Sequence, residues 1–187
     1  MSANTPKKKA KVYRRYPKSS LLIYNGATAA HFILGGVGII LGYGFSTLAI
    51  LFGIVYLAFA FGEMYLIMPF KVCPNCPYYR MKDSLCVSGM NIVSRRLTGP
   101  GNPKDFPKRA EGLLCPNNLY MASLMVPIIA MIPALLFYFS VLLLVIFIAV
   151  ILLLLFRFFV IFMKVACIHC AAKYTCPQAG QMGVREM

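Results

Sequence analysis

Residues 119–163 read LYMASLMVPIIAMIPALLFYFSVLLLVIFIAVILLLLFRFFVIFM, a run of 45 residues whose one charged side chain is Arg157. As a single helix this run would be about 67 Å long, whereas the hydrocarbon core of a bilayer is about 30 Å thick. We therefore expect it to cross a membrane twice and to turn near residues 138–140. Pro127 and Pro133 would kink the first of these two helices, which neighbouring helices can tolerate.

Two further apolar runs precede this one, at residues 20–41 and 46–70, with a glycine-containing turn at 42–44 between them. Hydrophobic residues make up 60% of the 187-residue chain, more than a soluble domain of this size can bury, so lipid must cover part of the surface. The small-xxx-small pair Gly38 and Gly42 permits close helix packing. A dimer face and the ordinary glycine content of membrane helices explain this pair equally well.

The sequence thus predicts an all-α membrane protein of four transmembrane helices, arranged as two antiparallel hairpins with a cysteine-rich loop between helices two and three. The segments are a basic arm that we expect to be disordered (1–19), hairpin one (20–70), the cysteine-rich loop (71–117), hairpin two (118–163) and a cysteine-containing tail (164–187).

The charge distribution predicts the orientation. The net charge is +14, and 18 of the 19 lysines and arginines lie in the arm, the loop and the tail, with none in the two turns on the opposite side. The positive-inside rule places the termini and the loop in the cytoplasm, as expected for a multi-pass protein of a prokaryotic inner or cell membrane. Because the charges flank apolar runs rather than line one polar face, they favour anionic lipid headgroups or an acidic partner subunit and argue against nucleic-acid binding.

All seven cysteines lie on this predicted cytoplasmic face, in two clusters. The loop cluster begins C-x2-C-x9-C and the tail cluster reads C-x2-C-x5-C with His169 inside its first pair. Each cluster starts within a few residues of a helix end, so the two clusters could be neighbours. The members are Cys73, Cys76, Cys86 and Cys115 in the loop and Cys167, Cys170 and Cys176 in the tail.

Metal ligation is the leading interpretation of these cysteines. The cytoplasm disfavours structural disulfides, and two thiolates at C-x2-C spacing can share one ion or cluster. The four loop cysteines could complete a tetrahedral site, whereas the three tail cysteines need a fourth ligand, which could be His169, a partner or an open position. Four of the seven cysteines precede proline, a pattern that occurs at both iron–sulfur and zinc sites, so the cofactor is expected to be an iron–sulfur cluster or zinc.

The cysteine pattern also resembles parts of known membrane enzyme families, and each resemblance fails at one feature. The helix count and paired cysteines resemble the DsbB-like and vitamin K epoxide reductase-like membrane enzymes, but the working cysteines of those families lie on the side opposite the cytoplasm. The spacing from Cys73 to Cys86 resembles the start of the DHHC palmitoyltransferase loop, but the loop here contains no histidine and no Asp-His-His-Cys motif. Unligated cysteines in a small structural subunit are a further alternative.

Three ionisable residues lie within the predicted helices, where charge is costly and function is the default expectation. His31 is expected to form a helix-to-helix hydrogen bond, with a quinone contact or proton relay as the alternative. Glu63 and Arg157 lie at matching depths of roughly 10 Å from the cytoplasmic ends of their helices. We expect them to form an ion pair, and we consider Glu63 a candidate for a proton path.

In the loop, residues 91–97 could form a short amphipathic helix whose Arg95 and Arg96 meet lipid phosphates, or a partner-docking patch. We expect a small membrane subunit with a cysteine-ligated metal centre that relays electrons to a membrane partner or a quinone, rather than a stand-alone enzyme. The alternatives are an anchor or scaffold subunit with structural zinc and, third, a soft-metal-ion transporter.

Overall fold

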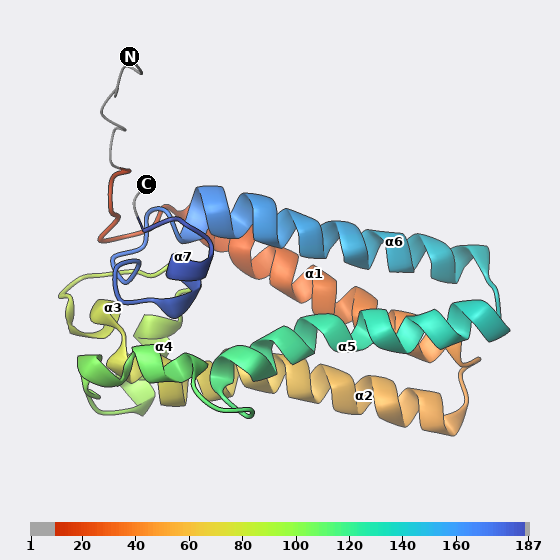
Figure 1. Ribbon diagram of the computed structural model, residues 1–187. Coiled ribbons are helices and arrows are strands. Elements are labelled where there is room, and N and C mark those ends of the chain that lie inside the picture. Colours follow the sequence, from red (N-terminus) through yellow and green to blue (C-terminus); the bar gives the residue numbers. More distant parts are fainter. Residues whose placement is uncertain (1–9, 186–187) are drawn as a thin grey trace, which may run out of the picture.

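The structure is a computed structural model that describes residues 10–185 of the chain. Four long apolar helices run back and forth as an antiparallel bundle, which confirms the predicted fold (Figure 1). We number them as spans 1 to 4. Their bounds are Lys18–Gly42, Thr47–Asn75, Pro116–Phe137 and Val141–Ala166. Span 1 is the helix α1 and span 3 is the helix α5. The turn expected within the long apolar run falls at residues 138–140, as predicted.

Spans 2 and 4 change their helical form along their length. In span 2 the helix α2 (Thr47–Gly62) continues as the π-helix η1 (Glu63–Val72). In span 4 the helix α6 (Val141–Phe156) continues as the π-helix η5 (Arg157–Ala166). Extended π-helical segments are rare in proteins. Where π-helical turns occur, they are often found at functional sites. Both of these segments lie at the same end of the bundle, next to the cysteines.

The glycines of α1 allow it to pack closely within the bundle. A Cβ atom added at Gly35 or Gly42 would lie 2.7 Å from the Cβ of Pro127 or Ala134, both on α5. A Cβ at Gly38 would meet the sulfur of Met131. The small-residue face therefore contacts α5 of the same chain, and close helix packing, as predicted from glycine spacing, is achieved within one molecule.

The loop and the tail fold together at one end of the bundle, which we call the loop end; both ends of the described chain lie there too (Figure 1). The elements of this end are short: η2 (Cys73–Asn75), α3 (Pro77–Arg80), α4 (Met90–Leu97), η3 (Pro103–Asp105), η4 (Pro107–Ala110) and α7 (Pro177–Gln181).

The short amphipathic helix expected in the loop is present as α4, and its Arg95 contacts the neighbouring element α3. Its guanidinium donates hydrogen bonds to the carbonyl oxygens of Tyr78 (2.5 Å) and Tyr79 (2.8 Å). Arg95 therefore holds α4 onto α3. Arg96 is exposed.

Residues 10–17 of the basic arm are held by hydrogen bonds, so the expectation of a disordered arm is wrong for this part. The amide of Tyr13 donates to the carbonyl of His169 (2.9 Å), and the amide of Tyr16 donates to the carbonyl of Leu85 (2.9 Å). The arm thereby connects the tail to the loop. Residues 1–9 lie outside the described residues.

Candidate functional site

The two C-x2-C pairs occupy equivalent positions in spans 2 and 4. Cys73 directly follows η1 and Cys167 directly follows η5, and each π-helix is 10 residues long. Both pairs then make the same turn, because the amide of Cys76 donates to the Cys73 carbonyl (3.0 Å) and that of Cys170 to the Cys167 carbonyl (3.2 Å). Antiparallel packing brings both turns to the loop end.

Six of the seven cysteines line a single cavity of about 180 Å³ at the loop end. Aromatic and methionine side chains make up much of the remaining wall, among them Tyr16 from the arm and Phe162 from span 4. The loop and tail clusters therefore meet at one site, which we call the cysteine cavity. Its cysteines are Cys73, Cys76, Cys86, Cys167, Cys170 and Cys176.

The arm closes one side of the cysteine cavity. Tyr16 is 2% exposed and its hydroxyl donates to the carbonyl of Ala166 (2.5 Å), the last residue of η5. The hydroxyl of Tyr78 donates to the carbonyl of Tyr13 (2.6 Å) and accepts from the amide of Ala171 (3.2 Å). Two tyrosines thus join the arm, the loop and the tail around the thiols.

The buried thiols of the cavity resist ionisation. Burial raises the pKa of Cys167 and that of Cys170 to about 12, and the neighbouring Cys176 thiol contributes to both increases. Burial also raises the pKa of Cys76 well above its usual range, with Cys170 as the next cause. These three thiols are therefore protonated at neutral pH unless a bound cation replaces their protons.

The arrangement does not match a single-ion site. Among residues 10–185, no group of three or more His, Cys, Asp or Glu side chains could hold one metal ion. Cys115 is absent from the cavity wall; it caps α5, where its sulfur accepts a hydrogen bond from the amide of Asn118 (3.4 Å). His169 stacks on Tyr13 (4.3 Å between ring centroids) and its Nδ1 donates to the carbonyl of Lys11 (2.7 Å).

One arginine of the loop faces the thiols. Arg109 lines the cavity and donates a hydrogen bond to Oε1 of Gln178 in the tail (2.5 Å), and its guanidinium lies 5.1 Å from the centroid of the Phe106 ring. Its positive charge opposes the rise in the pKa of Cys167. Arg109 therefore favours negative charge within the cavity.

Arg157 lies behind the inner wall of the cavity. Its guanidinium carbon is 4.9, 5.1 and 5.3 Å from the ring centroids of Tyr24, Tyr120 and Phe162, which all line the cavity as well. Its Nη1 donates to the hydroxyl of Thr28 (2.7 Å), while Nε and Nη2 have no hydrogen-bond partner among the described residues. The faces of aromatic rings attract a cation, so these rings partly replace the missing water.

The expected ion pair between Glu63 and Arg157 is wrong. Both carboxylate oxygens of Glu63 are buried without a hydrogen-bond partner in residues 10–185. Within the described part of the chain, the one ion pair between side chains joins Lys108 to Asp105. Arg157 contacts three aromatic rings and the hydroxyl of Thr28 instead. The two residues are the first residues of η1 and η5, but they do not pair.

His31 makes the helix-to-helix contact that the sequence predicts. Its Nε2 donates to the carbonyl of Leu124 on α5 (3.0 Å), and the side chain is 1% exposed. This hydrogen bond supports packing of α1 against α5. His31 does not line the cysteine cavity.

Three residues of the site escaped the sequence prediction: Tyr16, Tyr78 and Arg109. The one available signal concerned Tyr16: the basic arm contains aromatic residues, and an arm that only attracts anionic groups would not need them. Comparison with known families, curated proteins and solved structures finds no match to this chain.

Proposed function

We propose that the cysteine cavity binds an iron–sulfur cluster and that the protein is a membrane subunit that relays electrons. The donor would be a soluble reduced protein, and the acceptor a partner subunit or a quinone in the membrane. One observation carries the proposal: six cysteines from the loop and the tail line one cavity at the end of a four-span bundle.

The size of the site favours a cluster over a single ion. In a tetrahedral zinc site the sulfurs lie about 3.8 Å apart, as Zn–S bonds of about 2.3 Å require. The described residues contain no group that could hold one ion in this way. A cluster of several iron and sulfide atoms separates its thiolate ligands further, and the cavity of about 180 Å³ offers room for a multi-atom group.

The two C-x2-C pairs are the expected ligands, one pair from each half of the bundle: Cys73 with Cys76 and Cys167 with Cys170. Cys86 and Cys176 line the same cavity and would lie beside the cluster. When bound, the group supplies one-electron transfer. A cluster that accepts an electron gains one negative charge. Arg109 in the cavity wall and Arg157 behind the wall would stabilise that charge.

Metal binding would also change the protonation of the site. Because burial raises the pKa of Cys167 and of Cys170 to about 12, each must release a proton when it becomes a ligand. Binding should therefore strengthen as the pH rises.

The alternative is an anchor or scaffold subunit with structural zinc. It is favoured by the hydrogen bonds through which Tyr16 and Tyr78 join the arm, the loop and the tail. In this alternative the cysteines would only hold the loop end together, and no electron would pass.

Anaerobic purification followed by absorption spectroscopy and elemental analysis distinguishes the two functions. A broad brown absorbance, with iron and acid-labile sulfide in the protein, is expected for the relay. Cys73→Ser should remove the absorbance, whereas the matched control Cys115→Ser should keep it, because Cys115 lies outside the cavity wall. Colourless protein with stoichiometric zinc would establish the scaffold instead, and protein with neither metal would refute both.

A further inference from the structure

A second hollow, of about 230 Å³, lies at the loop end between the end of span 2 and the start of span 3. Lys71 and Asn75 of span 2 form one side and Pro116, the first residue of span 3, another. Lys108 and Arg109 of the loop complete it. Val72, Phe106 and Arg109 line both this hollow and the cysteine cavity, so the two sites share a wall.

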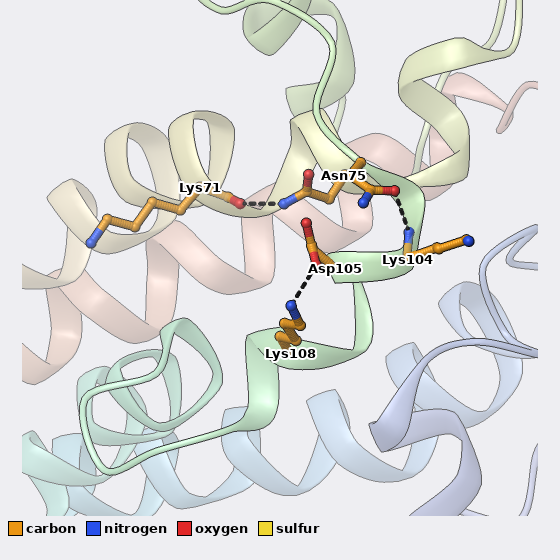
Figure 2. Close-up of polar contacts among 6 residues, drawn as sticks. Lys71, Asn75, Lys104, Asp105 and Lys108 are labelled. Atoms are coloured by element: carbon orange, nitrogen blue, oxygen red, sulfur yellow. Dashed lines mark hydrogen bonds and ion pairs between the residues drawn. The ribbon is translucent and has the colours of Figure 1, made fainter.

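The hollow carries an excess of positive charge. Lys71, Lys108 and Arg109 line it. Figure 2 shows the ammonium group of Lys108 directed at Asp105, while the side chain of Lys71 extends away from that pair. Among the described residues, Asp105 is the only acidic member of the wall, and it pairs with Lys108 (2.7 Å). Asn75 donates to the carbonyl of Lys71 (3.2 Å), which joins η2 to the end of η1. Lys71 is exposed, so its ammonium group is accessible to an anion.

The hollow lies at the end of a candidate membrane span, where lipid headgroups are expected. Lys71 lies four residues before the end of span 2, which corresponds to about 6 Å along the helix axis. Apolar side chains flank the hollow in the chain and are open to the surroundings: Phe70 is 48% exposed and Leu113 and Leu114 are 86% and 78% exposed. Such leucines are expected in contact with acyl chains rather than water.

We propose that this hollow binds the phosphate headgroup of an anionic phospholipid. Basic pockets between membrane helices attract such headgroups, and the exposed apolar residues beside this one suit the acyl chains. The depth and the apolar flank favour a lipid over the acidic surface of a soluble protein. The hollow shares a wall with the cysteine cavity but contains none of its cysteines, and it would bind lipid whether or not the cysteine cavity is filled.

The chain contains no tryptophan, so a single Phe70→Trp substitution beside Lys71 provides a unique fluorescent reporter. The full-length protein would be placed in bilayers of phosphatidylcholine and phosphatidylglycerol in which one lipid at a time carries brominated acyl chains. Quenching then measures the preference for each lipid. The site variant is Lys71→Gln with Lys108→Gln. The control is Lys164→Gln with Lys82→Gln, which removes the same charge from exposed lysines outside the hollow.

We expect the reporter protein and the control to prefer phosphatidylglycerol, and the site variant to lose about fivefold in preference per lysine, as ~1 kcal/mol per basic residue at the surface implies. Helical circular dichroism would establish that each variant is folded. Equal preference in the site and control variants would overturn the proposal. So would displacement of the lipid by millimolar inorganic phosphate, since the site would then serve a soluble anion.

Discussion

Spans 2 and 4 each contain a 16-residue α-helix that continues as a 10-residue π-helix, and a C-x2-C pair begins directly after each π-helix. The two π-helices nevertheless begin with residues of opposite charge. Glu63 starts η1 and Arg157 starts η5. The arginine is surrounded by three aromatic rings next to the cysteine cavity, whereas the carboxylate of Glu63 has no hydrogen-bond partner in the described part of the chain. The matching geometry brings the thiols together, and the unmatched charges give each half its own electrostatic environment.

The two halves also differ in the segment after the cysteine pair. After Cys76 the loop runs through α3 and α4 before it reaches span 3, whereas after Cys170 the tail is short. Each half nevertheless adds one further cysteine to the cavity, Cys86 or Cys176. The halves therefore contribute equally to the donor set, although their sequences show no repeat that would predict it.

The largest expected effect tests whether the halves share one centre. Cys73→Ser with Cys76→Ser, and separately Cys167→Ser with Cys170→Ser, should each reduce bound iron to background, because each pair would supply half of the ligands of the proposed cluster. Elemental analysis of anaerobically purified protein measures this. If one pair variant retained full iron while the other lost it, the cluster would belong to one half alone.

Thiol reactivity should show the next largest effect. Because burial raises the pKa of Cys170 to about 12 from an ordinary value of 9.0, its thiolate fraction at pH 8 is roughly a thousandfold smaller than in the unfolded chain. In chelator-treated protein, alkylation of this thiol should keep accelerating tenfold per pH unit up to about pH 12, whereas in denatured protein it should level off near pH 9. Mass spectrometry of the tail peptide would follow both. Equal rates in folded and denatured protein would contradict a buried tail thiol.

A smaller effect is expected from loosening the arm between the halves. Tyr16→Phe removes the hydroxyl that donates to Ala166 and should lower the free energy of unfolding by ~1 kcal/mol. Denaturant titration in detergent, followed by circular dichroism, measures the change. Tyr174→Phe is the control, because Tyr174 is 57% exposed, and it should have little effect. Equal losses in both variants would argue against the arm as a structural connection.

The smallest expected effect concerns the two opposite charges. A double-mutant cycle with Glu63→Gln and Arg157→Met should give a coupling energy below about 0.5 kcal/mol, because the two described side chains share no hydrogen bond or ion pair. Thermal unfolding of the four proteins in detergent supplies the cycle. A coupling energy of several kcal/mol would show that the two side chains do form an ion pair, and would contradict the structure. Loss of electron transfer in folded Glu63→Gln alone would support the proton path that the sequence suggested for Glu63.

The errors of the sequence prediction have identifiable causes. Glu63 and Arg157 were paired because their depths match, but depth is a coordinate along a helix axis and does not say which way a side chain points around it. The arm was expected to be disordered because it is basic, but Tyr13 and Tyr16 anchor it through backbone hydrogen bonds that composition does not reveal. The α4 helix was predicted from its own periodicity and is confirmed, yet the partners of Arg95 come from another element.

The sequence by itself determined the number of membrane crossings, the turn at residues 138–140 and the presence of both cysteine clusters at the same end of the bundle. These follow from the length of apolar runs relative to the bilayer, which each segment carries locally. Only the tertiary structure decided that six cysteines face one cavity while Cys115 caps α5, and that rings rather than a carboxylate surround Arg157. Those outcomes depend on the rotation of each helix about its axis and on how the loop folds over the bundle. Packing between segments that are distant in the sequence determines both.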